Sequence, residues 1–157
     1  MRRLTAILVI LFVLLAGFTA WFWLGGTLHA QVHIQTASAA DYPEAFGAIR
    51  DLLESGSAPQ MFGDAGLTKA PSAYTLVDVN LTLTNRGLFP AEWLDIRAEA
   101  ATGDIAVYAL TGEGSDIPAR DSGRVNLKLI TTAPADAGRV ITIQYYVHGM
   151  KRSITVR

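Results

Sequence analysis

Hydrophobic residues fill the start of the chain without interruption. From Leu4 to Leu24 there are 21 consecutive residues without a charge, and as a helix they would be about 31 Å long, close to the hydrocarbon thickness of a bilayer. Arg2 and Arg3 precede this segment, and the next charge is Asp41. Because positively charged flanks stay on the cytoplasmic side, residues 1–25 are predicted to be a cytoplasmic N-terminus and a transmembrane anchor, with the rest of the chain extracytoplasmic.

The end of this apolar segment bears on whether it is retained. Trp21 and Trp23 lie where aromatic rings favour the membrane interface. A secretory signal cut near Ala30 is an alternative, and a buried core helix is another. The apolar region of a signal is usually about 7 to 15 residues long, and Leu28 is larger than the residue preferred three positions before a cut. The pattern therefore favours a retained anchor.

Residues 26–73 are predicted to form a juxtamembrane strand, a short helix and a loop. Val32, Ile34 and Thr36 alternate with polar residues, as in a strand. Residues 55–73 are rich in Gly, Pro and Ser and lack either periodicity, which predicts a loop. Within this loop, Met61, Phe62 and Leu67 are predicted to point inward.

A short amphipathic helix is predicted between the strand and the loop. Asp41 is the expected N-cap, and Pro43 suits the first turn because its missing N–H is not needed there. Three apolar residues with helical spacing follow, and Gly56 is a stop signal; the three are Phe46, Ile49 and Leu53. We expect this apolar stripe to cover the domain's own core, with docking on a partner as the alternative.

Residues 74–157 change to a repeated period of two. Val77, Val79, Leu81 and Leu83 alternate with polar residues. Further strand patterns follow, separated by Gly, Pro and Asp turns: AEWLDIRAEA, DIAVYAL, RVNLKLI, RVITIQYYV and RSITVR. Six or seven short strands at this spacing predict a mainly β domain, an antiparallel two-sheet sandwich.

The runs VDVNLTLTNRGLFPAEWLDI, IPARDSGRVNLKL and ITIQYYVHG carry a resemblance to known families. They resemble the membrane-anchored immunoglobulin-like domains of the late-embryogenesis-abundant type 2 (water stress and hypersensitive response) family. They are also similar to bacterial adhesion-type sandwich modules. The resemblance covers residues 74–157 and implies an immunoglobulin-like fold and a non-enzymatic role in the cell envelope. It carries over no catalytic residue.

Composition and charge exclude several classes of function. The formal net charge is −1, so the basic surface typical of a nucleic-acid-binding protein is not expected. Cysteine is absent, and no serine has the G-x-S-x-G spacing. His29 and His33 are four residues apart but lie in an extended pattern, and Glu113 and Asp116 belong to a single turn rather than a repeat. We therefore predict no enzyme activity, no metal and no cofactor.

Aromatic residues provide the candidate interaction surface. Trp93 alternates with Leu94 and Ile96, so it is expected to face away from the core unless the strand bulges near Pro90. Only one of Tyr145 and Tyr146 can point outward, because successive strand residues face opposite ways. Trp93, Tyr145 and Tyr146 form the candidate set, since aromatic side chains dominate interface energetics.

Two hypotheses of function remain. The first is a single-pass anchored module with a structural or interaction role, binding another envelope protein or a wall polymer by its edges or loops. The second is a module that binds a hydrophobic, lipid-like ligand between its sheets. A void of several hundred cubic ångströms between the sheets would favour the second hypothesis.

Overall fold

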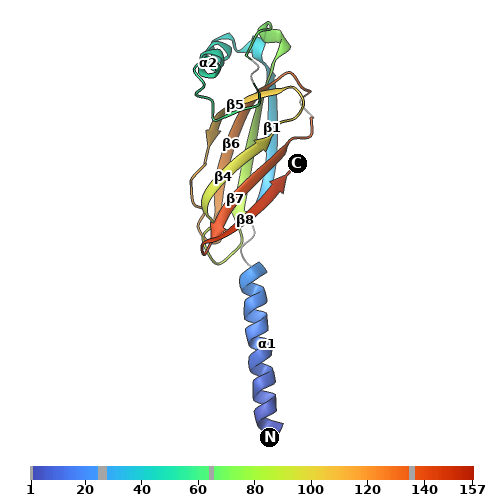
Figure 1. The fold of residues 1–157 in the computed structure, drawn as a ribbon, viewed down its shortest axis with the longest axis vertical. Coiled ribbons are helices and arrows are strands. Elements are labelled where there is room, and N and C mark those ends of the chain that lie inside the picture. The colour runs from blue at the N-terminus through green and yellow to red at the C-terminus, as the bar shows by residue number, and fades with distance from the viewer. Residues whose placement is uncertain (1, 25–27, 64–65, 135–136) are drawn as a thin grey trace.

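The molecule is a two-sheet β-sandwich with one helix extending from its lower end (Figure 1). The computed structural model describes residues 2–24, 28–63, 66–134 and 137–157. One sheet has the strand order β1-β3-β6-β5-β2 and the other has the order β4-β7-β8, and all neighbouring strands are antiparallel. The predicted mainly β fold with two antiparallel sheets is confirmed.

The elements follow the predicted order along the chain. The helices are α1 (Arg2–Leu24) and α2 (Pro43–Glu54), with short 3-10 turns η1 (Ala39–Asp41) and η2 (Pro71–Ala73). The strands are β1 (Leu28–Ser38), β2 (Gln60–Met61), β3 (Thr75–Asn85), β4 (Glu92–Glu99), β5 (Asp104–Thr111), β6 (Ser122–Thr131), β7 (Val140–Val147) and β8 (Met150–Val156).

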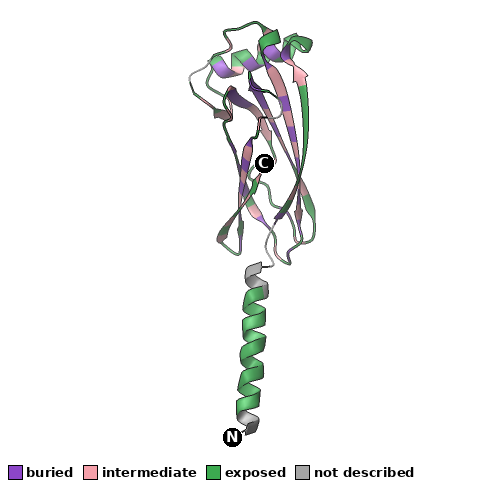
Figure 2. Cartoon of the chain, turned by 90° about the vertical axis from the view of Figure 1, so that its right-hand side faces the viewer, coloured by how far each residue is buried: buried purple, intermediate pink, exposed green. Residues whose placement is uncertain are grey.

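The main core lies between the two sheets, where alternate strand residues meet. In β3 the buried positions are those predicted from the period of two: Val77, Val79, Leu81 and Leu83. Leu94 and Ile96 of β4 and Ile143 of β7 contribute from the facing sheet. Figure 2 shows this alternation as purple bands along the strands. Burial of apolar side chains, at about 25 cal/mol per Å², is the main force that holds the sheets together.

Helix α2 covers part of the outer face of the five-stranded sheet at the end opposite α1 (Figure 1). Leu129 packs between the sheets, so its neighbour Ile130 faces outward and packs in a second cluster with Phe46 and Ile49. The apolar stripe of the helix is therefore used within the domain, as predicted.

The predicted N-cap of α2 is wrong by one residue. Asp41 lies in η1, and Tyr42 occupies the N-cap position without a side-chain capping bond. The reason is Pro43, which is the first helical residue and disfavours helical geometry in the residue before it. At the other end, Gly56 has φ +66°, and its N–H bonds to the Leu53 carbonyl, so the predicted stop signal is confirmed.

Residues 28–73 contribute strands to the sandwich. All 11 residues of β1 pair with β3. The predicted loop of residues 55–73 contains the two-residue strand β2, which pairs with β5. Gln60 anchors the loop, since its side-chain amide bonds both the N–H and the carbonyl of Ala98. Phe62 and Leu67 pack inward as predicted, whereas Met61 is exposed.

Helix α1 is separate from the sandwich (Figure 1). Its described side chains, those of residues 5–20, are all exposed (Figure 2). Among the described residues, no helical stretch combines the length and hydropathy that crossing a membrane requires. The side chains of Trp21 and Trp23, predicted to mark the membrane interface, lie outside the described residues.

Candidate functional site

The predicted aromatic surface is reduced from three residues to two. Trp93 is 72% exposed and Tyr146 is 39% exposed, whereas Tyr145 is fully buried. The inclusion of Tyr145 is therefore wrong, because the strand pleat turns it into the core while its neighbour faces out. Glu92 pairs with Tyr146 in the register of β4 and β7, so Trp93 and Tyr146 belong to one region of the three-stranded sheet.

Trp93 is exposed, as alternation with buried Leu94 and Ile96 predicted, although β4 is irregular at its start. The register between β4 and β7 shifts between Glu92 and Asp95, which is the mark of a bulge. Trp93 has φ +53°, a left-handed conformation that is unfavourable for a bulky residue. Asp116 stabilises it by accepting a hydrogen bond from the Trp93 N–H at 2.9 Å. Sequence alternation predicted the exposure, but not this conformation.

Buried Tyr145 connects the first residue of β1 to the opposite sheet. Its hydroxyl accepts a hydrogen bond from the Leu28 N–H at 3.1 Å. Leu28 is also paired with Asn85 at the end of β3, and its side chain is buried in the main core. Tyr145 therefore has a structural role, which fixes the beginning of β1 within the sandwich.

Trp93 and Tyr146 lie at the end of the sandwich where β1 begins, which we call the base. The base comprises Leu28, the connection from β3 to β4, the connection from β5 to β6, and the turn between β7 and β8. Asn85 joins the first two connections, since its side-chain amide donates to the carbonyls of Phe89 and Ile117. Hydrogen bonds therefore join the connections that make up the base.

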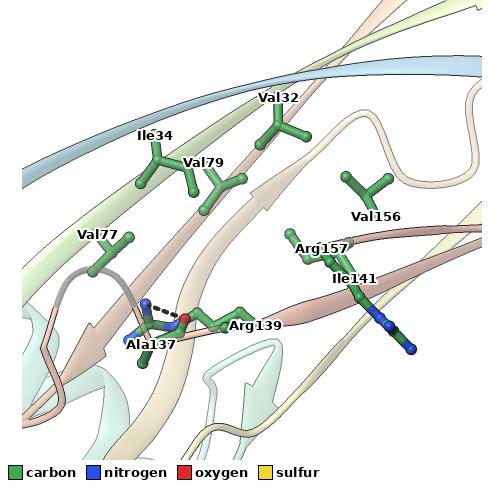
Figure 3. Close-up of a pocket in the computed structure, with 10 residues that line it drawn as sticks. Val32, Ile34, Val77, Val79, Ala137, Arg139, Ile141, Val156 and Arg157 are labelled. Atoms are coloured by element: carbon green, nitrogen blue, oxygen red, sulfur yellow. Dashed lines mark hydrogen bonds between the residues drawn. The ribbon is translucent and has the colours of Figure 1, made fainter.

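A second candidate site lies between the free edges of the two sheets. A cavity of about 140 Å³ opens there, which we call the seam (Figure 3). Its apolar walls come from β1 and β3 on one side and from β7 and β8 on the other: Val32, Ile34, Val77, Val79, Ile141 and Val156. Ala137, Gly138 and Arg139 close one end, and Arg157 also lines it.

Strand β1 forms the open side of the seam. It is the last strand of its sheet, so within the described residues no strand pairs with its outer side. Residues 31–36 are exposed on both faces, and Val32 and Ile34 are among the exposed apolar residues. The strand contains no charge and no proline, so it lacks the features that usually protect a sheet edge from pairing with another chain.

A buried ion pair lies beside the seam. Arg139 binds Asp104 with two nitrogens, at 2.8 Å from Nη2 and 3.1 to 3.2 Å from Nε. Burial by itself would raise the pKa of the Asp104 carboxyl, but hydrogen bonds from Arg139, Thr131 and the Ala101 N–H hold that pKa below its usual value. The pair joins the start of β5 to the segment before β7, which stabilises this end.

The outer face of the five-stranded sheet has a polar depression of about 380 Å³ lined by Asn80, Arg124 and Asn126. Its polar groups largely satisfy one another. Asn126 donates to Asp78 and, at 2.9 Å, to Asn80, and Lys128 lies 3.6 Å from Asp78. Burial and the charge of Asp78 raise the pKa of Tyr108 on this face. These polar residues therefore bind one another on a solvent-facing surface of the sheet, and no ligand is needed to explain them.

The other residues that the sequence singled out, His29, His33, Glu113 and Asp116, do not form a metal site among the described residues. His29 and His33 are on strand β1, not on a helix, and the His33 ring lies 3.2 Å from the Gln35 amide. Among the described residues, no group of three or more His, Cys, Asp or Glu side chains converges as metal ligands would. Asp116 is engaged with the backbone of Trp93.

The seam and the ion pair have little signature in the amino-acid sequence. The weak signal for the seam was a run of residues without charge from 28 to 40, which contains a strand pattern. Asp104 and Arg139 are 35 residues apart, and nothing in local periodicity links them.

Comparison with known proteins gives no match, either to a model of a protein family or to a curated protein.

Proposed function

We propose that this protein is a membrane-anchored interaction module without enzymatic activity. In this proposal, α1 crosses the membrane with its N-terminus in the cytoplasm and holds the sandwich on the other side. The sandwich then binds an extended segment of another envelope protein along strand β1. The observation that carries this proposal is the uncharged, unprotected edge of β1 beside an apolar seam.

The anchor is supported by sequence and by exposure. The uncharged run of 21 residues preceded by two arginines suits a single span, and it is longer than the stretch of residues 5–20 whose side chains the structure describes. The described side chains of α1 are exposed, although most of them are large and apolar. Such a surface needs a partner, and α1 does not find it in the sandwich (Figure 1). A lipid bilayer is the simplest environment that covers a single apolar helix on all sides.

The strand order supports an immunoglobulin-like fold for the module. The strands β1, β3, β4, β5, β6, β7 and β8 correspond in chain order to strands A to G of a seven-stranded immunoglobulin-type sandwich. The sheets β1-β3-β6-β5 and β4-β7-β8 then match its A-B-E-D and C-F-G sheets. Sandwiches of this kind host many functions, so we infer binding from the edge strand and not from the fold.

Binding by strand addition follows from the chemistry of β1. A partner strand would satisfy the outer backbone groups of β1 with main-chain hydrogen bonds. Its alternate side chains would meet Val32, Ile34 and Val156 at the seam, where apolar groups are already exposed or half-buried. The partner predicted by this geometry is an extended, uncharged peptide with small apolar residues at every second position.

The seam is too small for the alternative function. Ligand pockets usually enclose about 300 to 1,000 Å³, whereas the seam holds about 140 Å³. A depression of about 290 Å³ at the opposite edge, beside Ile96 and Leu110, is also lined by the charged residues Asp95, Arg97 and Glu113, which do not suit a lipid-like ligand. The inward positions between the sheets are filled by Val, Leu and Ile side chains. The volume of the seam suits one or two side chains of a bound strand better than a lipid-like molecule.

Site-specific photo-cross-linking in native membranes tests strand addition. A photoreactive residue replaces His33, which is exposed at the centre of β1. We expect one adduct, whose cross-linked peptide in the partner has apolar residues at alternate positions. The substitutions Val32→Lys and Ile34→Lys should abolish this adduct, because lysine protects an edge strand from pairing.

Tyr42→Lys and Met61→Lys provide the matched control. Both residues lie outside β1: Tyr42 follows η1, and Met61 is in β2 at the opposite edge of the sheet. Their exposure is similar to that of Val32 and Ile34. Their replacement should leave the adduct intact. Absence of any adduct, or loss of the adduct in both pairs of variants, would contradict strand addition.

The anchor is tested separately. Because the chain has no cysteine, Ser57→Cys introduces a single thiol on the exposed segment after α2. We expect this thiol to react with a membrane-impermeant maleimide on intact cells, and the protein to stay in the membrane after an alkaline wash. Release by the wash, or labelling only after the cells are opened, would refute the anchored topology.

A further inference from the structure

We propose that the base of the sandwich rests on the lipid headgroup layer, with Trp93, Leu88 and Tyr146 as its contacts. This inference rests on the proposed anchor and extends it: the membrane would be a second binding partner, which sets the orientation of the module. Four observations about the described residues support it.

The first observation is the length of the tether. Helix α1 ends at Leu24 and β1 begins at Leu28, so three residues connect them in sequence. Even a fully extended chain covers at most about 14 Å over these four steps. The headgroup and interfacial region is about 5 to 7 Å thick on each side of the hydrocarbon. A spanning α1 that ends at the edge of the hydrocarbon would therefore keep Leu28 within about 14 Å of that edge, close to the headgroups.

The second observation is that Leu28 is firmly part of the sandwich. Its side chain is buried, its backbone pairs with Asn85, and its N–H bonds to the Tyr145 hydroxyl at 3.1 Å. The short tether therefore ends on a rigid body, not on a loop. Leu28 belongs to the base, and α1 extends from this end of the sandwich (Figure 1). A spanning α1 would therefore put the base next to the membrane.

The third observation is the chemistry of the base. Trp93, Leu88 and Tyr146 are all large, apolar or amphipathic, and exposed there. Tryptophan and tyrosine favour the headgroup layer, where the ring is partly in hydrocarbon and the polar atom stays hydrated. Exposed charges at this end have both signs, since Arg86 and Lys151 are accompanied by Glu113 and Asp121. The contact should therefore depend on the aromatic residues and require no anionic lipid.

The fourth observation is the backbone of Trp93. A bulky residue rarely adopts φ +53°, and Asp116 and the bulge in β4 hold it there. Strained residues of this kind often occur where a side chain must be presented for a function. An exposed tryptophan in this conformation contributes little to the core, so contact with the membrane would explain why Trp93 is held there.

Depth-dependent fluorescence quenching tests the inference on the full chain. Trp21→Phe and Trp23→Phe leave Trp93 as the single tryptophan. The protein is placed in phosphatidylcholine vesicles that carry bromine either near the headgroups or deep in the acyl chains. We expect about a twofold loss of Trp93 fluorescence with the shallow bromines and a smaller loss with the deep ones, since tryptophan prefers the interface.

A matched reporter at the other end provides the control. A second chain combines Trp21→Phe, Trp23→Phe and Trp93→Phe with Tyr42→Trp, which puts the single tryptophan at an exposed site near α2. This reporter should not be quenched by either lipid. Equal and negligible quenching at positions 93 and 42 would overturn the inference.

Flotation of the same vesicles separates the two proposals. If the chain floats with the vesicles and Trp93 is not quenched, the anchor stands and the seating of the base is refuted. If the chain does not float, the anchor itself fails, and the inference fails with it. Flotation together with quenching at position 93 alone supports both.

Discussion

The two ends of the sandwich differ in backbone conformation and in the interactions that stabilise them. At the end near α2, the described residues with left-handed backbone are the glycines Gly56, Gly63 and Gly103, and a buried ion pair joins the strands. At the base, Trp93, Arg120 and His148 adopt such a conformation although they are not glycine. The far end avoids strain, whereas the base retains it together with exposed aromatic residues. Left-handed non-glycine residues and exposed aromatic side chains therefore occur together at the base, whereas the end near α2, called the far end, is stabilised by the buried ion pair.

Loss of the buried ion pair should have the largest effect on stability. Arg139→Met removes the partner of the buried Asp104 carboxylate, and an unpaired buried charge costs about 3 to 5 kcal/mol. We expect this decrease in the free energy of unfolding, measured by urea titration of the full chain in detergent micelles. Lys128→Met is the control, because the Lys128–Asp78 pair is partly exposed and should contribute less than about 1 kcal/mol. Equal effects of the two variants would contradict the assignment of stability to the far end.

The same ion pair predicts a dependence on acid pH. The pKa of Asp104 is lowered in the folded protein, so its contribution to stability is complete above the ordinary value of 3.8. The contribution is then lost as the pH falls from this value through the lowered pKa, because in that range the unfolded chain binds a proton that the folded chain does not. Urea midpoints measured from about pH 5 down to about pH 2 should fall more steeply for the natural chain than for Asp104→Asn. Parallel declines would contradict this source of acid sensitivity.

Removal of the Tyr145 hydroxyl should have a smaller effect, centred on the base. Tyr145→Phe keeps the ring in the core but leaves the Leu28 N–H without its acceptor, which should cost about 1 kcal/mol. Hydrogen exchange at the Leu28 amide should become faster, whereas exchange near α2 should not change. Tyr146→Phe is the matched control, since that ring is exposed and its change should stay within about 0.5 kcal/mol. If the two variants behave alike, Tyr145 does not fix the start of β1.

Much of the fold follows from local patterns. The period of two predicted the buried positions of β3 and the exposure of Trp93, and helical spacing predicted that Phe46, Ile49 and Leu53 are buried. These predictions hold because each residue's direction is set by its own element. The error at Asp41 has the same local origin, since the restriction that Pro43 imposes on Tyr42 outweighed the capping preference of the aspartate.

The candidate sites depended on contacts that no local pattern contains. Alternation requires that one of two successive tyrosines be buried, but only the packing of the sheets decided that it is Tyr145 and that its hydroxyl binds Leu28, 117 residues away. The seam likewise depends on which strands became the free edges, and β1 and β8 are far apart in the chain.

By itself, the sequence determined an apolar N-terminal segment, a series of alternating strands and a helix with one buried face. Only the tertiary structure decided that Trp93 and Tyr146 share one end with Leu28, and that β1 is left open beside Val156. The physical reason is that the direction of a side chain is set by the dihedral angles of its own strand. Its neighbours, in contrast, are set by strand order and by the packing of one sheet on the other.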